Sequence, residues 1–419
     1  MLFNFRIIFI GGRILEKINY EKIKENPPVV AVMNITDECN LRCKYCFTHP
    51  HPTVMSLETG IDAVKWLTSN YFARPENKRQ APRINFFGGE PTLRYEELMI
   101  PLMEWTDRNI NPQLPENHKF KWGMTTNGTL LTKERLRYLA ARKDFVILFS
   151  CDGDAPTQNM QRRTKGNEDS FHLVEKNIDD LLYYFPQVTF RSTATPDSVS
   201  RLTEDYIFAR ERGFKQYFFM PNCREPWTQE QLQELGYQMS NIGWLMYNDI
   251  INQRHTLIYT DLVKTMTNMV IHKNPSMKCI TCQQCGFGCG SVGITTNGII
   301  SACQERNTYD TNDLFIIGDI YKGIDQFKHE KLLKHIEEVP NRESKLNCDN
   351  CPIKTTCSGR LCPSTNYDMT GNPCISPDVT CYWHILLYEV AKAICEVAAL
   401  ENNENFANFM KINSKKIYF

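Results

Sequence analysis

The sequence predicts an α/β protein built on an open, partial barrel of six strand-and-helix units, followed by a cysteine-rich segment. From residue 29 to about residue 223, short apolar runs alternate with amphipathic helical patterns, and each run ends in polar or glycine-rich sequence. Right-handed crossovers would curl such units into one parallel sheet. Six units favour a partial barrel over the closed eight-stranded form. The predicted strands are 29–33, 83–87, 120–124, 145–149, 187–193 and 216–220.

Helical patterns connect these strands at 58–69, 95–107, 132–142, 170–184 and 204–212. A capping-box sequence from Thr228 to Gln231 begins a further helix that extends to about residue 252, and another helical pattern covers 259–272. The segment 278–381 has little apolar periodicity, so we expect metal clusters rather than a hydrophobic core to hold it. The predicted division is an N-terminal extension (1–28), the barrel (29–225), bridging helices (226–277), the cysteine-rich domain (278–383), and a C-terminal helix and tail (384–419) whose helix could pack on the barrel.

Composition excludes several classes of protein. The 419 residues contain 42% hydrophobic and 23% charged residues, which is enough apolar sequence for a sizeable core. Lys and Arg (48) balance Asp and Glu (48), so no basic surface for nucleic acid or an anionic membrane is expected. The apolar stretch 2–10 is too short for a membrane span or a full signal peptide. The 17 cysteines therefore favour metal binding in a reducing cytoplasm over disulfides.

Three cysteines directly after the first strand form the motif that carries the chemistry. Cys39, Cys43 and Cys46 are spaced C-x3-C-x2-C, so one loop can bring three thiols to one face of an iron–sulfur cluster. A four-iron cluster takes four ligands, which would leave one iron open, as in catalytic metal sites. A zinc knuckle and a chance grouping of core thiols are the alternatives.

This motif, with the aromatic Tyr45 before its last thiol, resembles the radical S-adenosylmethionine (radical SAM) superfamily. The resemblance implies that Cys39, Cys43 and Cys46 hold a [4Fe-4S] cluster whose open iron chelates the amino and carboxylate groups of S-adenosylmethionine. Reduction of the sulfonium would then release a 5′-deoxyadenosyl radical. It also implies an external electron donor such as flavodoxin or ferredoxin.

A second motif, Gly88-Gly89-Glu90-Pro91, closes the second strand. Glycines let a ligand approach the backbone, and a carboxylate can pair with an ammonium group. Alone the sequence is an ordinary turn, but at this position it resembles the superfamily motif for the methionine amino group. Polar residues at later strand ends are further candidates for contacts with the cofactor, although turn formation and N-capping would explain them too. The predicted cofactor-binding residues are Tyr45, Phe47, Gly88, Gly89, Glu90, Pro91, Asn127, Ser150, Asp152 and Arg191.

The later cysteines resemble the SPASM extension of radical SAM enzymes, which holds two auxiliary [4Fe-4S] clusters. The sequence departs from that pattern once, because four residues instead of the usual three separate Cys357 from Cys362. Tetrahedral zinc is the alternative for this set. By the resemblance, one cluster would take Cys285, Cys303, Cys362 and one of Cys279 (preferred), Cys282 or Cys289; the other would take Cys348, Cys351, Cys357 and Cys381, with Cys374 as the fallback for Cys381.

The resemblance implies a maturase that takes hydrogen from a ribosomally made precursor peptide or a protein and installs a thioether, a carbon–carbon crosslink or an oxidised residue. An anaerobic sulfatase maturase, which makes formylglycine, is the first alternative. In those enzymes an acidic residue thought to act as a base directly follows the equivalent of Cys303, whereas this chain has Gln304 and then Glu305. A non-catalytic electron carrier or zinc-binding module is the second alternative, and it leaves the barrel and Gly88 to Glu90 unexplained.

Overall fold

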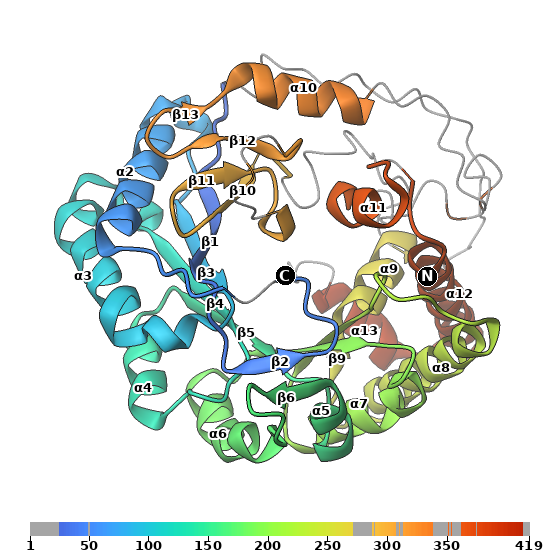
Figure 1. The fold of residues 1–419 in the computed structure, drawn as a ribbon. Helices are drawn as coiled ribbons and strands as arrows, with labels where there is room; N and C mark the ends of the chain where they lie inside the picture. Colours follow the sequence, from blue (N-terminus) through green and yellow to red (C-terminus); the bar gives the residue numbers. More distant parts are fainter. Residues whose placement is uncertain are drawn as a thin grey trace.

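The computed structural model describes residues 25–48, 51–270, 287–288, 290–306, 310, 313–337, 351, 353, 362–373 and 375–413. Its main feature is one curved sheet in the order β13-β12-β11-β10-β1-β3-β4-β5-β7-β8-β9. Helices line the outer side of the curved sheet (Figure 1). The predicted α/β partial barrel is therefore confirmed.

All six predicted strands are present and lie in parallel register with their neighbours. In several of them fully buried side chains, such as Ala31, Met33 and Ile35 of the first strand, alternate with partly exposed ones. The strands are β1 (Val30–Thr36), β3 (Arg83–Gly88), β4 (Lys121–Thr126), β5 (Phe145–Ser150), β7 (Thr189–Ala194) and β8 (Gln216–Pro221).

The crossover helices follow the predicted positions, with caps that match the sequence. Ser56 accepts a hydrogen bond from the backbone of Thr59, and Thr132 accepts one from Arg135. The helix predicted over 95–107 begins instead with a π-helical segment, Tyr95–Met99. The crossover helices are α2 (Leu57–Ala73), α3 (Ile100–Asn109), α4 (Lys133–Ala141), α6 (Phe171–Tyr184) and α7 (Leu202–Glu211); short 3-10 segments are Glu76–Lys78, Pro91–Arg94, Asn111–Gln113, Glu116–His118, Val199–Arg201 and Gln304–Arg306.

A small second sheet, which the sequence did not predict, crosses the barrel beside the cysteine loop. The strand β2 (Leu41–Cys43) lies within that loop, and β6 (Arg162–Thr164) follows the short helix α5 (Ala155–Gln161). The two strands pair antiparallel, with Cys43 opposite Arg162. The connection from β5 to α6 therefore returns to the cysteine loop before the barrel continues.

Both edges of the six-stranded sheet are extended by strands from later parts of the chain. At one edge β9 (Ile258–Tyr259) pairs parallel with β8, between the helices α8 (Gln229–Ile251) and α9 (Thr260–Val270). At the other edge β10 (Ser291–Ile294) pairs parallel with β1. The antiparallel strands β11 (Ile299–Ser301), β12 (Ile316–Asp319) and β13 (Gly323–Ile324) continue from β10, and the helix α10 (Gln326–Glu337) follows.

The expectation that segment 278–381 lacks a hydrophobic core is wrong for its described part. Val292, Ile294, Ile300, Phe315 and Ile317 are almost fully buried and belong to the same core as the barrel. Apart from Phe315, which precedes β12, these residues lie in strands of only three or four residues, so the sequence shows no alternation long enough to be recognised.

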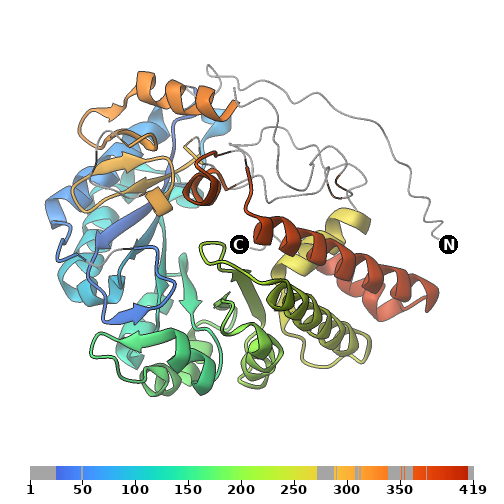
Figure 2. The same ribbon diagram turned by 45° about the vertical axis from the view of Figure 1, so that its right-hand side comes forward.

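The capping box at the start of α8 is confirmed, because the Thr228 side chain accepts from the Gln231 backbone and the Gln231 side chain accepts from Thr228. The helix α12 (Asp378–Leu400), predicted over 384–399, packs mainly on α8 and α9 (Figure 2). Gly243 of α8 permits this approach, since a Cβ there would lie 2.6 Å from Val390. The helices α11 (Pro363–Thr370) and α13 (Glu404–Asn413) complete the described part of the chain, where no helix is long and apolar enough to cross a membrane.

Candidate active site

The cysteine loop leaves the C-terminal end of β1 and is closed by its own backbone. The Leu41 N–H donates to the Cys39 sulfur at 3.4 Å, and the Cys46 N–H donates to the Cys43 carbonyl at 3.2 Å. Cys39 and Cys43 are half-buried, while Cys46 is exposed. Burial, with Glu90 as the next contribution, raises the pKa of Cys39 to about 12. Burial likewise raises the pKa of Cys43 to about 11. Thiolate ligands in this loop therefore require a strong positive charge at the sulfurs, which the iron of a cluster would supply.

Gly88 and Gly89 lie against the start of the cysteine loop. The Gly89 N–H donates to the Thr36 carbonyl at 2.8 Å, and the Glu90 N–H donates to the Glu38 carbonyl at 2.9 Å. A Cβ at Gly88 would lie 2.0 Å from the Thr36 oxygen, and one at Gly89 would lie 2.1 Å from the Glu38 oxygen. Because of this close approach, the end of β3 holds the loop that carries the three cysteines.

Glu90 is buried, and its carboxylate is bonded to the ends of two strands. Its Oε1 accepts from the Thr92 backbone at 3.1 Å and from the Thr126 hydroxyl at 2.7 Å, and its Oε2 accepts from the Asn127 backbone at 2.7 Å. Burial raises the pKa of Glu90, although these hydrogen bonds oppose the effect. The side chain of Asn127 donates in turn to Asn40 at 2.9 Å. Glu90 and Asn127 therefore join β3 and β4 to the cysteine loop, and the buried Pro91 begins the next turn.

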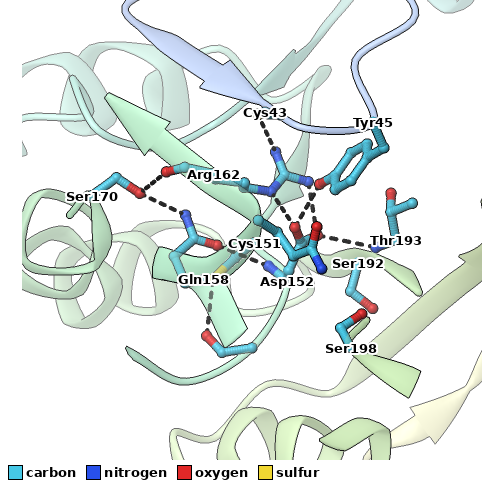
Figure 3. Close-up of polar contacts among 12 residues, drawn as sticks. Cys43, Tyr45, Cys151, Asp152, Gln158, Arg162, Ser170, Ser192, Thr193 and Ser198 are labelled. Atoms are coloured by element: carbon cyan, nitrogen blue, oxygen red, sulfur yellow. Dashed lines mark hydrogen bonds and ion pairs between the residues drawn. The ribbon is translucent and has the colours of Figure 1, made fainter. Parts of the chain in front are cut away.

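Asp152 is the centre of a buried cluster at the end of β5 (Figure 3). Its Oδ2 accepts from the Tyr45 hydroxyl at 2.6 Å and lies 2.9 Å from Nε of Arg162, while its Oδ1 accepts from Nη2 of Arg162 and from the Thr193 backbone, both at 3.0 Å. The side chains of Asp152 and Arg162 are 0% and 5% exposed. Burial acts to lower the pKa of Arg162, but the charge of Asp152 outweighs it, so the pKa stands well above its ordinary value.

Three polar side chains at the ends of β5 and β7 have unused hydrogen-bonding capacity. Ser150 and Arg191 are partners in the β5–β7 register, and neither side chain has a hydrogen bond or ion pair within the described residues. The hydroxyl of Thr193 is buried and also lacks a partner in the described chain. Burial lowers the pKa of Arg191, and the charges of Tyr45 and Asp152 oppose this effect. A guanidinium beside free hydroxyls fits a ligand that carries a carboxylate.

Phe47 and Arg224 connect the cysteine loop to the later part of the chain. The Phe47 ring stacks on Phe87 with centroids 6.4 Å apart, and the Arg224 guanidinium lies 5.2 Å from the Phe47 centroid. Nη2 of Arg224 bonds Glu305 and Asp368, both at 3.0 Å. Glu305, the acidic residue that follows Gln304, is therefore held in an ion pair.

Four of the predicted auxiliary-cluster ligands lie in the described chain: Cys303, Cys351, Cys362 and Cys381. Contacts between Thr365 and Glu305 (3.3 Å) and between Arg306 and the Ser364 carbonyl (2.8 Å) bring the segments after Cys303 and Cys362 together. No three His, Cys, Asp or Glu side chains of the described residues are grouped to hold a single metal ion. The other predicted ligands and alternatives lie outside the described residues: Cys279, Cys282, Cys285, Cys289, Cys348, Cys357 and Cys374.

The functional candidates that the sequence did not reveal are Arg162 and Arg224. Arg162 lies in a three-residue strand whose partner is more than 100 residues earlier, and Arg224 bonds residues 81 and 144 positions later in the chain. No local spacing signals either contact. Cys151 is a fully buried core thiol that donates to the Gly153 carbonyl at 3.4 Å.

Sequence comparison identifies the class of this domain. The model of the radical SAM superfamily matches residues 33–198, which include the cysteine loop, Gly88 to Pro91 and the ends of β4, β5 and β7. This match and the site geometry identify residues 33–198 as a radical SAM domain, the class defined by S-adenosylmethionine and a [4Fe-4S] cluster.

The chain is also similar to two named enzymes. It is 27% identical over 246 residues to the cysteine-type anaerobic sulfatase-maturating enzyme of Clostridium perfringens, a match that covers 56% of this chain and 65% of the relative. It is 23% identical to the radical SAM cyclopropyl synthase TigE of Paramaledivibacter caminithermalis, over 83% of this chain and 70% of TigE.

Solved structures share the fold. The structure of native anSMEcpe with bound AdoMet and Cp18Cys peptide matches with a TM-score of 0.69 at 21% identity, over 89% of this chain and 99% of that one. Streptococcus suis SuiB bound to its precursor peptide SuiA matches with a TM-score of 0.57 at 16% identity, over 89% of this chain and 84% of SuiB. The similarity to both extends beyond the barrel into the described C-terminal part.

Proposed function

We propose that this protein is a radical SAM maturase that modifies a ribosomally synthesised peptide by installing a crosslink or an oxidised residue. The observation that carries the proposal is the grouping of Cys39, Cys43 and Cys46 with Gly88, Gly89 and the unpartnered Arg191 at one end of the barrel. Two structures of the same fold contain bound peptides, Cp18Cys in anSMEcpe and the precursor SuiA in SuiB, and this supports a peptide substrate.

Each residue group has a defined task in this proposal. The three thiolates hold the cluster, and the strand end at Gly88 and Gly89 fixes their loop. Arg191, with Ser150 and Thr193, binds the methionine carboxylate of S-adenosylmethionine, because this guanidinium has no carboxylate partner within the described chain. Glu90 and Asp152 position other residues of the site, since their carboxylate oxygens are already hydrogen-bonded to the protein. Glu90 holds Thr126 and Asn127, and Asp152 holds Tyr45 and Arg162.

Cys39, Cys43 and Cys46 would hold the cluster, which when reduced would supply the one electron needed to break the bond between sulfur and C5′, giving methionine and a 5′-deoxyadenosyl radical. The radical takes one hydrogen atom from the peptide. Formation of a new bond then removes one more electron and one proton from the peptide. Two auxiliary clusters on the later cysteines would accept that electron, and solvent or a base would accept the proton. An external low-potential carrier such as flavodoxin or ferredoxin supplies the first electron.

The test is anaerobic reconstitution with iron and sulfide, followed by reduction with dithionite in the presence of S-adenosylmethionine. We expect about twelve irons per chain for three four-iron clusters and formation of 5′-deoxyadenosine. A triple variant, Cys39→Ala, Cys43→Ala and Cys46→Ala, should lose about four of these irons and all 5′-deoxyadenosine formation. Wild-type protein that holds its clusters but yields no 5′-deoxyadenosine would overturn the proposal.

Sulfatase maturation is the second candidate, and the 27% identity to the Clostridium perfringens enzyme supports it. Against it, Gln304 stands where those enzymes place an acidic residue, and the nearby Glu305 is bonded to Arg224 and Thr365. Mass spectrometry separates the two functions. A cysteine-containing sulfatase peptide would exchange its thiol for an aldehyde oxygen, whereas a crosslinked precursor peptide would lose two hydrogens. Turnover of the sulfatase peptide alone would favour the second candidate.

A further inference from the structure

We propose that Arg162 is a positioning residue that holds the Cys39–Cys46 loop on the barrel and places a buried positive charge beside the cluster, which favours the reduced cluster. The inference rests on the proposed function in so far as that function assigns a cluster to this loop. Arg162 lies outside both the cysteine motif and the Gly88 to Pro91 motif.

The backbone around Arg162 holds a later part of the cysteine loop than the part held by Gly88 and Gly89. Cys43 lies directly across from Arg162 in the β2–β6 pair. The Lys44 N–H donates to the Gln161 carbonyl, and the Lys165 N–H donates to the Asn40 carbonyl, both at 2.9 Å. The start of the loop is therefore held by the end of β3, and its middle is held by β6 and the residues next to it.

The Arg162 side chain points from β6 toward the middle of the loop. Nη1 lies 4.0 Å from the Cys43 sulfur, and the guanidinium carbon lies 5.4 Å from the Tyr45 ring centroid. The other two nitrogens face Asp152, which the Tyr45 hydroxyl also contacts (Figure 3). One guanidinium thus contacts a proposed ligand and the residue two positions later.

Asp152 is itself fixed from three elements, so the guanidinium has little freedom to move. The Asp152 N–H donates to the Gln158 side chain of α5 at 3.0 Å, and the Thr193 N–H of β7 donates to its carboxylate. Ser170, before α6, accepts a bond from Gln158 at 3.4 Å. The elements β5, α5 and β7 therefore hold Asp152 in place, Asp152 holds Arg162, and Arg162 contacts Cys43.

Burial makes the charge of Arg162 effective at the sulfur. With both side chains at most 5% exposed, salt and water screen the charge poorly. The negative charge of Asp152 offsets part of the positive charge of Arg162. However, Nη1, which approaches the Cys43 sulfur, is the guanidinium nitrogen that does not contact the carboxylate. Reduction adds one electron to the cluster from an external one-electron carrier, which is oxidised, and no bond breaks. An N–H donor at a ligand sulfur stabilises this added negative charge.

The experiment compares Arg162→Lys and the double variant Arg162→Gln with Asp152→Asn, which removes both members of this buried ion pair together. Arg201→Gln is the matched control, because Arg201 pairs with Asp154 in the same loop but faces neither Cys43 nor Tyr45. Electron paramagnetic resonance during a redox titration reports the midpoint potential of the cluster whose signal is absent from the Cys39, Cys43 and Cys46 triple alanine variant.

We expect the double variant to lower the equilibrium constant for reduction about tenfold, a shift of about 59 mV for one electron. Arg162→Lys should shift it less, and Arg201→Gln should leave it unchanged. Hydrogen exchange of the cluster-free protein tests positioning, with faster exchange expected over residues 39–48 in both Arg162 variants. An unchanged potential or unchanged exchange overturns the corresponding half of the proposal. Wild-type protein with a reducible cluster but no 5′-deoxyadenosine would instead reject the proposed function alone.

Discussion

At the scale of single residues, the strictest requirement lies where β3 meets the cysteine loop. Gly88 has φ +127°, a conformation that other residues rarely adopt, and its α-carbon faces the Thr36 carbonyl. Neither property depends on a ligand. The glycines of this motif are therefore needed to build the loop, whatever contacts their backbone makes with the cofactor.

Replacing Gly88 with alanine should displace the loop, because the new Cβ would lie 2.0 Å from the Thr36 oxygen. We expect a loss of about 2–4 kcal/mol of stability, reduced iron incorporation at the cysteine loop and little 5′-deoxyadenosine. Thermal unfolding, iron analysis and product assay measure these effects. Gly166→Ala is the control, since the nearest atom to its Cβ would be 3.8 Å away. Equal stability and iron content in the two variants would contradict this account of the motif.

The residue scale also shows what sequence reasoning could and could not predict. The cysteines and Gly88 to Pro91 were found because their chemistry is encoded by local spacing. The partners of Glu90 were not, since Thr126 lies 36 residues later and meets it only through the β3–β4 pairing. Glu90 and Asp152 were predicted to contact the cofactor, and the structure adds that their carboxylates are already bonded to Thr126, Asn127, Tyr45 and Arg162.

At the scale of elements, the length of a strand determines whether the sequence predicts it. The six barrel strands have six or seven residues, enough to form recognisable apolar runs. The strands β6, β9 and β13 have two or three residues, and their positions depend on the strands with which they pair. The π-helical start of α3 was missed for a related reason, because its side chains follow an ordinary helical pattern.

The helix α7 supports the loop after β5 through a buried acid, and this contact should be pH-dependent. Asp205 is 1% exposed and accepts from the Asp154 N–H at 3.3 Å. Burial, with the charge of Asp154, raises the pKa of Asp205 well above its ordinary value, while Arg201 opposes the shift. The folded protein therefore favours the protonated acid, and the resulting stability is lost as pH rises toward the folded-state pKa.

Asp205→Asn should remove this loss. Between the unfolded-state and folded-state pKa values, the folded wild type holds one more proton than the unfolded chain, so its free energy of unfolding falls by about 1.4 kcal/mol per pH unit. The variant lacks this proton, so it should gain stability relative to wild type as pH increases. Unfolding midpoints at pH 5, 6.5 and 8 measure the slope. Asp154→Asn, which breaks an ion pair with Arg201, should instead destabilise the protein at neutral pH. The idea fails if wild type and Asp205→Asn change in parallel with pH.

At the scale of the whole molecule, the cysteine-rich part is joined to the barrel in two different ways. The strands β10 to β13 extend the sheet at β1, so their hydrophobic residues share the barrel core. At the end of the cysteine loop, Arg224 bonds Glu305 and Asp368 and stacks over Phe47. The first connection is apolar, whereas the second is ionic and only partly shielded from solvent.

Because the second connection is ionic, it should loosen without unfolding the barrel. Arg224→Met removes both ion pairs, although Asp368 keeps Arg306. We expect about fivefold faster hydrogen exchange in α11, equivalent to ~1 kcal/mol, and no change in β3 or β4. High salt should bring wild type part of the way toward the variant, since these side chains are about a quarter exposed. Arg212→Met, which removes a peripheral pair with Glu175, should leave α11 unchanged. If α11 exchanges equally in wild type and Arg224→Met at low salt, Arg224 does not couple the cysteine loop to the segment after Cys362.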